Sequence, residues 1–225
     1  MSNDLEKTLS LHFREFTPVL SYLDVSKYVS IDLSIYSDFI DSIDVSDPLK
    51  MDLLINNFLS KKSKKVAFGG YLEKRNLYER SEYFNTDRKR NIHLGIDLWC
   101  SPLTDVIAPL NGKIHSFANN LNFGDYGPTI ILEHNLDDIT FYTLYGHLSV
   151  RSLLDLEIGK SVDKGDIIAQ LGTHLENGSY APHLHFQIID NIGSFHGDYP
   201  GVCDEKDKDF YKKNCLDPNI ILCLE

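Results

Sequence analysis

Histidine and aspartate gather in three short segments of this sequence. The first, HLGID, places His93 and Asp97 four residues apart. On a β-strand, side chains at this spacing share one face, while the apolar residues beside them face a core. A nitrogen and an oxygen ligand on one face suit a zinc ion, and Gly95 between them leaves room above the backbone. For this segment alone, a hydrogen-bonded His/Asp pair without metal is an open alternative.

The second segment, HLHF, carries His183 and His185 on one face of an expected strand, with Leu184 and Phe186 on the core side. One imidazole can bind a metal while the other transfers protons. Without metal, each buried ring nitrogen would need its own hydrogen-bond partner. The third segment, YGHLS, places His147 at the end of an expected strand. A lone histidine there is usually structural, so His147 gains weight only beside the other two segments.

In chain order the three segments form HxxxD, GHLS and HLH, and this arrangement resembles the lysostaphin/LytM zinc metalloendopeptidases over residues 92–189. Two intervening stretches, VIAPLNGKI and IGKSVDKGD, look like the A-P-x-x-G turn and G-x-x-V-x-x-G hairpin of that family. The resemblance implies that His93, Asp97 and His185 bind one zinc ion per chain. It places His147 and His183 beside the zinc as catalytic residues, and it implies peptidoglycan cross-bridges or stem peptides as substrates.

General metal chemistry then supplies a mechanism. Three protein ligands leave a position for water, whose pKa zinc lowers from about 15.7 towards about 7. The oxyanion that forms would be stabilised by zinc and by a hydrogen bond from His147. His183, or His147 in a shared role, would orient the water and pass a proton to the leaving amine. The sequence does not divide these two roles between the histidines.

The elements that must position these residues are mainly strands. From residue 92 onward, short runs rich in β-branched residues alternate with turn signals, which predicts a compact antiparallel β domain. The resemblance implies a sandwich or barrel-like fold of the duplicated hybrid motif type. Helical spacing over residues 5–23 and 48–59 predicts that the first sixty residues are largely helical. We therefore expect a helical extension over 1–69 and a peptidase domain over 70–225, whose irregular tail packs back through Ile220, Ile221 and Leu222.

Composition narrows the partners. The formal charge of −11 over 225 residues opposes binding to a phosphate backbone, so no nucleic-acid partner is expected. No apolar run is long enough for a transmembrane segment, and the start lacks a secretory signal. The sequence therefore predicts a cytoplasmic protein, or an extracytoplasmic one if a targeting segment was removed. Four scattered cysteines predict reduced thiols, and the oligomeric state stays open.

Two other functions compete with the peptidase. The β segments also resemble lipoyl/biotinyl and phosphohistidine carrier domains, but no lysine lies in an MKM or DKA sequence, and a phosphohistidine carrier would not need Asp97. A regulatory binding module is the other alternative, and the N-terminal segment could cover a groove or form an oligomer contact. The remaining histidines are expected to be structural or exposed, and Glu133 or Asp190 is a guess for a group that orients a ligand imidazole. Those histidines are His12, His115, His134, His174 and His196.

Overall fold

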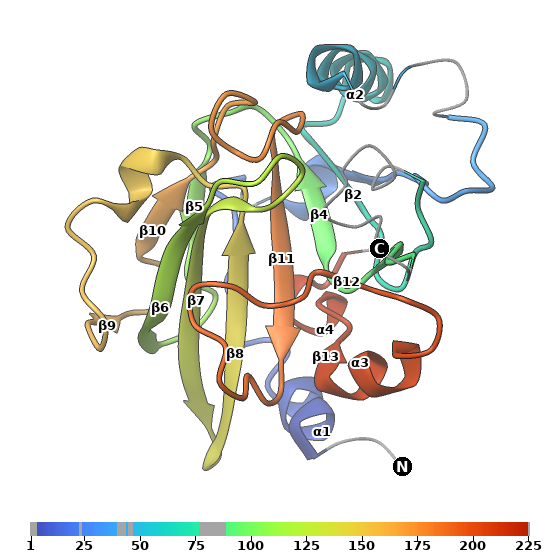
Figure 1. Ribbon diagram of the computed structural model, residues 1–225. Helices are drawn as coiled ribbons and strands as arrows, with labels where there is room; N and C mark the ends of the chain where they lie inside the picture. The colour runs from blue at the N-terminus through green and yellow to red at the C-terminus, as the bar shows by residue number, and fades with distance from the viewer. Residues whose placement is uncertain (1–3, 23, 40–43, 45–46, 77–88, 225) are drawn as a thin grey trace.

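One large β-sheet organises the computed structural model, which describes residues 4–22, 24–39, 44, 47–76 and 89–224 (Figure 1). Its strand order is β1-β2-β4-β11-β8-β7-β6-β9, and β13 also pairs with β11. Neighbouring strands are antiparallel except for the parallel pair β1 and β2. The strands of this sheet are β1 (Tyr28–Ser30), β2 (Val66–Gly69), β4 (Ile96–Trp99), β6 (Gly112–Asn120), β7 (Gly127–Leu136), β8 (Ile139–Gly146), β9 (Ser161–Val162), β11 (His183–Ile189) and β13 (Cys215–Leu216).

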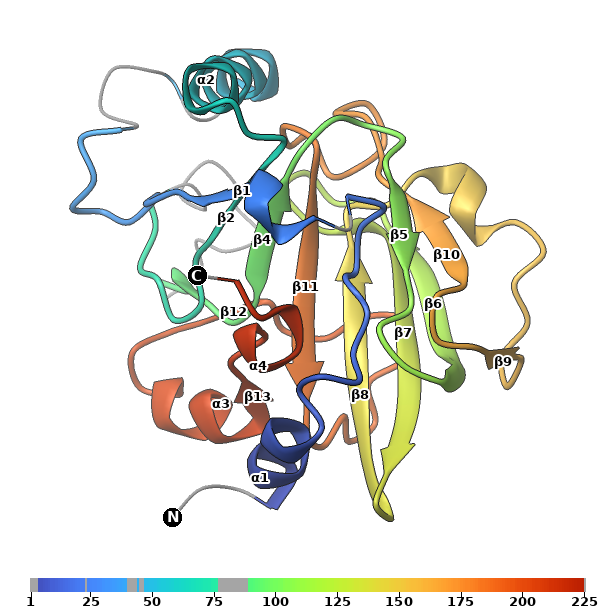
Figure 2. The ribbon, with the colours of Figure 1, turned by 180° about the vertical axis from the view of Figure 1, so that it is seen from behind.

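Two smaller antiparallel pairs complete the β structure. They are β5 (Asp105–Ile107) with β10 (Ile167–Gln170), and β3 (Ile92–His93) with β12 (Val202–Cys203). Figure 2 shows β5 and the N-terminal segment crossing the rear of the large sheet. The main core lies there and includes Leu98, Leu184 and Phe186 from the sheet together with Val106 from β5. This layered arrangement confirms the predicted mainly β, sandwich-like fold.

The N-terminal region contains less helix than expected. Helix α1 (Asp4–Leu11) buries Leu5 and Leu9 and then ends, and the predicted helix to residue 23 does not form over the described residues. Pro18 accounts for the absence of helix around residue 17 and beyond, because proline lacks an N–H and disfavours helical geometry at the preceding Thr17. Residues 17–21 instead run beside β5, with backbone hydrogen bonds that include Ile107 N–H to the Val19 carbonyl at 2.9 Å. Leu23 lies outside the described residues.

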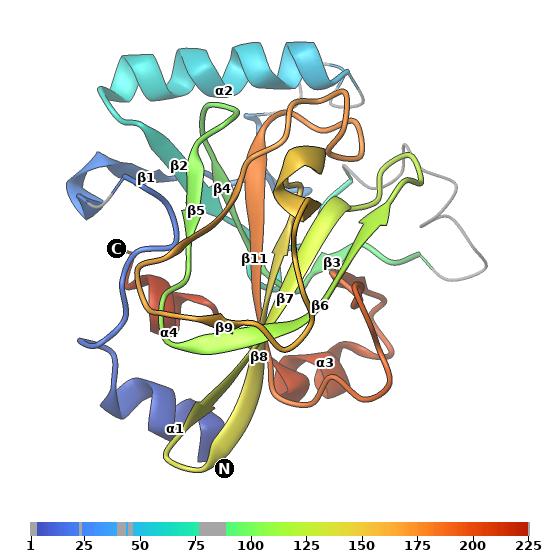
Figure 3. The same ribbon diagram turned by 90° about the vertical axis from the view of Figure 1, so that its left-hand side faces the viewer.

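The second predicted helix is confirmed as α2 (Pro48–Lys62), which begins after the N-cap Asp47 and a proline at the first turn. Its buried face, Met51, Ile55 and Leu59, packs in a cluster with Trp99 of β4. Figure 3 shows α2 lying across one end of the sheet. Between the two helices, the described residues contain the short 3-10 helix η1 (Val25–Lys27) and strand β1, so the region before residue 70 contributes β1 and β2 to the sheet.

The C-terminal tail is not irregular, which corrects the sequence prediction. It forms α3 (Lys208–Asn214), β13 and α4 (Asn219–Leu222). Elsewhere in the chain, a second 3-10 helix, η3 (Val150–Leu153), lies between β8 and β9. Ile221 and Leu222 are buried in the main core, as the sequence predicts. None of the helices in the described residues combines the length and the apolar character needed to cross a bilayer.

Candidate metal centre and active site

The central strand β11 carries two of the candidate residues on one face. Residues of β11 alternate, so that Leu184 and Phe186 enter the main core while His183 and His185 face the other way. In the antiparallel register with β4, His185 lies opposite Asp97 and His183 lies opposite Trp99. Trp99 stacks on His183, with ring centroids 4.0 Å apart and planes 20° apart. The sheet register therefore brings the carboxylate to His185 and fixes the plane of His183.

His93 reaches the same place from a separate strand. The sequence predicts one strand through HLGID, but the chain bends at Leu94 and Gly95, and His93 belongs to β3 whereas Asp97 belongs to β4. A Cβ atom at Gly95 would lie 2.7 Å from His185 Nε2, so a larger residue would displace the imidazole. The sequence predicts that Gly95 leaves space above the backbone, and in the structure the His185 imidazole occupies that space.

Three ligand atoms converge at the meeting point of these strands. His93 Nε2 lies 2.9 Å from His185 Nδ1 and 3.2 Å from Asp97 Oδ1, and His185 Nδ1 lies 3.3 Å from Asp97 Oδ1. Tetrahedral zinc with bonds of about 2.0–2.1 Å separates its ligand atoms by about 3.3–3.4 Å. Asp97 Oδ1 is buried and accepts no hydrogen bond from the described residues. The three atoms thus fit a zinc ion in size and in chemistry.

The second ring nitrogens show which tautomers are present. His93 Nδ1 lies 3.0 Å from the Gly70 carbonyl and His185 Nε2 lies 2.9 Å from Gln187 Oε1. Because both oxygens only accept, these ring nitrogens must donate, which leaves lone pairs on His93 Nε2 and His185 Nδ1. Two lone pairs and a carboxylate oxygen therefore face one another, an arrangement that repels itself unless a cation lies between.

His183 and His147 lie beside this triad, and in both rings Nδ1 carries the proton. His183 Nδ1 donates to the Ala181 carbonyl at 2.8 Å, and His147 Nδ1 donates to the Asn177 carbonyl at 2.8 Å. Each neutral ring therefore keeps a lone pair on Nε2. His183 Nε2 is 3.8 Å from Asp97 Oδ1, farther than the triad atoms, and the rings of His147 and His183 are 4.2 Å apart. Both rings therefore lie next to the triad with their Nδ1 atoms bonded to backbone carbonyls.

Burial sets the protonation states. It lowers the pKa of His93 and of His183 to about 4, and burial followed by the neighbouring His183 and His185 lowers the pKa of His147 well below its ordinary value. Burial alone would raise the pKa of Asp97, but charge interactions, with His93 first and then with Arg75, hold it well below its ordinary value. The His93 ring is itself neutral at pH 7, so the permanent positive charge beside Asp97 is that of Arg75. The triad therefore includes the neutral imidazole of His93 and the carboxylate of Asp97.

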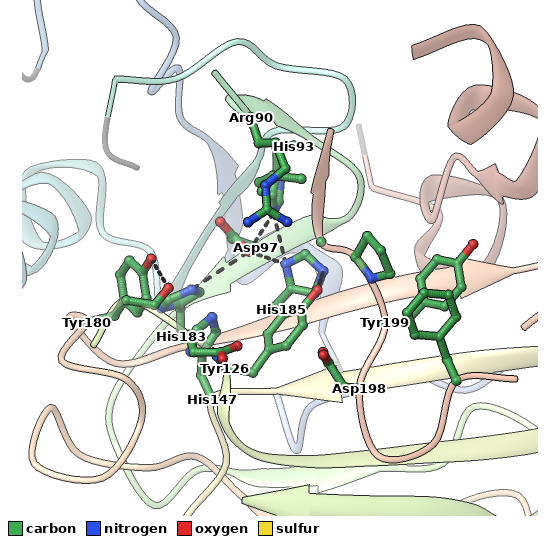
Figure 4. Close-up of a pocket in the computed structure, with 16 residues that line it drawn as sticks. Arg90, His93, Asp97, Tyr126, His147, Tyr180, His183, His185, Asp198 and Tyr199 are labelled. Carbon is green, nitrogen blue, oxygen red and sulfur yellow. Dashed lines mark hydrogen bonds and ion pairs between the residues drawn. The ribbon is translucent and has the colours of Figure 1, made fainter. Parts of the chain in front are cut away.

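These residues open into a cavity of about 320 Å³. Figure 4 shows His93, Asp97 and His185 clustered at one side, with His183, His147 and Tyr126 next to them. Aromatic side chains that line the cavity are those of Tyr180, Phe195 and Tyr199. Charged side chains that line it are those of Asp125, Asp198 and Arg90. Burial, followed by the charge of Asp125, raises the pKa of Asp198. The cavity therefore carries both apolar and charged surface.

Several groups at the site were missed by the sequence reasoning. Arg75, which is buried and bonds Asp97, lies in no pattern that links it to the motifs. Gln187 follows His183 and His185 on the same strand face, so alternation could have found it. The guess that Glu133 orients a ligand imidazole is wrong, since Glu133 pairs with Lys113 at 2.8 Å on the neighbouring strands. Carbonyl and amide oxygens orient the four imidazoles instead of Glu133 or Asp190.

The other histidines take no part in the triad. His134 is buried and bonds the Asn111 carbonyl and the Thr143 hydroxyl, whereas His12 bonds Glu15 and Asp137 at the surface. Among the described residues, His93, Asp97 and His185 form the group that could hold a metal ion. The remaining histidines, His115, His174 and His196, are partly or fully exposed.

Comparison with known proteins agrees with the motifs. The model of Peptidase family M23 matches residues 91–196, a range that contains all five candidate residues. Among solved structures, the catalytic domain of the antimicrobial peptidase lysostaphin from Staphylococcus simulans is 32% identical, with 54% of this chain and 80% of that domain covered and a TM-score of 0.38. The comparison with curated proteins found no match.

Two further solved structures are similar over less of their length. A second structure, of the antimicrobial peptidase lysostaphin from Staphylococcus simulans, is 31% identical, with 53% of this chain and 44% of that chain covered and a TM-score of 0.36. A zinc containing peptidase from Vibrio cholerae is 27% identical, with 44% and 28% covered and a TM-score of 0.34. The chain thus spans less than half of either protein. The family match over every candidate residue, with 32% identity across four fifths of the lysostaphin catalytic domain, shows that this chain belongs to peptidase family M23.

Proposed function

We propose that this protein is a zinc-dependent endopeptidase that binds one zinc ion per chain through His93, Asp97 and His185. Its substrates in this proposal are the flexible peptides of peptidoglycan, either cross-bridges or stem peptides. The observation that carries the proposal is the convergence of two imidazole lone pairs and a carboxylate oxygen within 3.3 Å of one another. Membership of family M23 supports the reaction type.

Bound zinc would polarise the scissile carbonyl and acidify a water molecule, which is its usual contribution to peptide hydrolysis. The chain's own residues would handle the protons. The Nε2 lone pairs of His183 and His147 can orient that water and accept its proton, because both rings are neutral at pH 7. Once protonated, either ring can donate to the oxyanion or to the leaving amine. The geometry gives both rings the same starting tautomer, so the two roles stay shared in this proposal.

The cavity supports a peptide as the substrate. It is about 320 Å³ in volume, and tyrosine and phenylalanine side chains form much of its wall. In this proposal the substrate is an extended segment with small side chains, such as a glycine-rich cross-bridge, because such a segment needs the least room beside a buried metal centre. Lysostaphin from Staphylococcus simulans, which is 32% identical to this chain, is an antimicrobial peptidase, and a cell-wall substrate is consistent with that relationship.

Burial argues against the carrier alternative. A phosphohistidine carrier must present its histidine to partner proteins, whereas His183 and His185 are only 2% and 3% exposed. A regulatory binding module would have no need for a buried, self-repelling ligand set, because such a set costs stability unless a metal occupies it. Zinc content therefore separates these alternatives from the peptidase.

The test is hydrolysis by purified, zinc-loaded protein. Glycine-rich peptides, peptidoglycan stem peptides and cell-wall fragments should be incubated with it, and mass spectrometry should identify the bond cleaved. We expect cleavage of at least one class, with none by the chelated protein or by His185→Ala. If the zinc-loaded protein cleaves none of the three classes, the proposed peptidoglycan substrate is wrong.

A further inference from the structure

Arg75 lies behind the candidate metal centre and contacts Asp97 from the side opposite the triad. Its side chain is 1% exposed, and its Nη1 donates to Asp97 Oδ2 at 2.5 Å. Its Nε donates to Glu73 Oε2, and its Nη2 donates to the Gly69 carbonyl at 3.3 Å. The guanidinium therefore bonds three groups at once, and these bonds fix the orientation of its plane. The ammonium group of a lysine is a single point of charge and could not be held in this way.

The two oxygens of Asp97 consequently have different partners. Oδ1 faces His93 Nε2 and His185 Nδ1 and accepts no hydrogen bond from the described residues, whereas Oδ2 is bonded to Arg75. A carboxylate can bind a metal through one oxygen or through both. A charge-assisted bond from Arg75 occupies Oδ2 and leaves Oδ1 alone to face the metal. Three single-atom ligands would leave a coordination position for water on a zinc ion held there.

The backbone around Arg75 is built to keep it there. A Cβ atom at Gly70 would lie 2.0 Å from Arg75 Nη2, and Gly70 has a φ of +111°, a conformation that L-residues avoid. The Gly70 carbonyl also accepts from His93 Nδ1, so one turn supports both His93 and Arg75. On the far side, Glu73 Oε1 accepts from the Leu33 N–H at 3.1 Å. The support for Asp97 therefore continues into the N-terminal region.

We propose that Arg75 is a positioning residue that holds Asp97 as a one-oxygen metal ligand and so preserves the coordination position at which water is activated. This inference rests on the proposed zinc site. It assigns a role at the centre to a residue outside residues 91–196, the range that the family model matches. The described residues that line the cavity do not include Arg75, so it acts through Asp97 and not on the substrate.

Two variants test this role. Arg75→Lys keeps the buried charge but cannot bond Glu73 and Asp97 in one plane, and the double variant Glu73→Gln/Arg75→Met removes both charges of the pair together. In the double variant, the new amide oxygen at position 73 can still accept from Leu33 N–H, which protects the fold. The matched control is Lys74→Met, because Lys74 is the adjacent, exposed cation and pairs with Glu205 at 3.8 Å.

The readouts are metal affinity, the visible spectrum of the cobalt-substituted protein, and kcat and KM measured separately. Loss of a group that orients a metal ligand typically costs about 10–100-fold in metal affinity or activity. We expect a kcat loss of that size in the double variant with little change in KM, and a smaller loss in Arg75→Lys. The cobalt absorption should weaken in the same order, because five-coordinate cobalt absorbs less than tetrahedral cobalt. Lys74→Met should match the wild type in every readout.

The proposal is overturned if both folded variants keep the wild-type cobalt spectrum and bind zinc within about twofold of the wild type. It is also overturned if Lys74→Met changes the spectrum as much as they do. The spectrum and the zinc affinity need no substrate, so they test Arg75 even where peptide hydrolysis fails. If the wild type hydrolyses no peptide but the Arg75 variants still show the expected change in the cobalt spectrum, the proposed substrate is refuted and the role of Arg75 is supported.

Discussion

Replacement of His183 by alanine should separate metal binding from proton transfer. His183 Nε2 lies 3.8 Å from Asp97 Oδ1, whereas the triad atoms lie 2.9–3.3 Å apart, so the substitution removes no atom of the triad. Zinc content should therefore stay at one ion per chain. Removal of a positioned base typically slows a reaction by about 10²–10⁴-fold. At about 1.36 kcal/mol for each factor of ten, this loss is about 2.7–5.4 kcal/mol of transition-state stabilisation.

The same substitution also removes the ring that stacks on Trp99. Aromatic pairs contribute about 0.5–1.5 kcal/mol beyond their buried area, so the variant should be measurably less stable yet remain folded. Elemental analysis should measure the zinc, peptide hydrolysis the kcat, and thermal unfolding the stability. His115→Ala is the control, because His115 lies on β6 outside the triad and should affect neither zinc nor kcat.

Two results would refute this reasoning. Loss of zinc from His183→Ala would mean that His183, and not its neighbour two residues later, is the ligand from β11. Full activity with full zinc would mean that the His183 lone pair has no part in the reaction. His147→Ala carries the same expectation for zinc and for rate, because His147 presents the same nitrogen to the site.

The metal ligands, a buried histidine and helix α2 each give a further prediction. Replacing His93, Asp97 or His185 by alanine should each reduce bound zinc well below one ion per chain in elemental analysis, and a chelator should lower the unfolding temperature of the wild type but not of these variants. His134 is buried neutral with a pKa of about 4, against 6.5 when exposed, so the folded state binds fewer protons and stability falls as pH drops from about 6.5 to about 4. The fall in stability amounts to about 3 kcal/mol. Urea unfolding should therefore show a smaller difference in the free energy of unfolding between pH 7 and pH 4.5 for His134→Gln than for the wild type. An equal difference in the two proteins would contradict this prediction. Ile55→Ala should destabilise the protein by about 2–5 kcal/mol in urea unfolding, because Ile55 is 3% exposed in the cluster around Trp99, whereas a value near zero would mean that α2 contributes little to the fold.

The strand-borne part of the site could be predicted because strand periodicity is local. His183 and His185 share a face whatever lies beside β11, and the pattern of β-branched runs identifies the strands that flank them. The convergence of His93 with Asp97 was also predicted, although by a different geometry: the chain bends at Gly95, and Ile92 and Leu94 enter a separate core cluster from that of Ile96. The two residues meet through tertiary packing and not through one strand face.

The rest of the site depends on contacts that no local pattern encodes. Arg75 meets Asp97 because the residues after β2 run beside β3, with a bridge between Lys74 and Ile92 and a hydrogen bond from the Arg75 N–H to the Asn91 carbonyl. The oxygens that fix the imidazole tautomers are mostly backbone carbonyls, which every residue carries and which sequence therefore cannot distinguish. In the N-terminal region, the spacing of apolar residues is typical of a helix. The segment around Val19 instead buries its apolar side chains as an extended chain beside β5.

The pairing of β2 with β4 also limits how this catalytic region can be exchanged between proteins. Removing everything before Ile92 would leave β4 as an edge strand, with unpaired backbone groups directly beside Asp97. Exposed edges of this kind recruit strands from other molecules and promote aggregation. A recombination boundary just before the HLGID segment would therefore give a chain that carries every ligand residue yet is prone to self-association. A transferable unit of this enzyme therefore has to begin upstream of Val66, so that β2 still covers the edge of β4 beside the candidate metal centre.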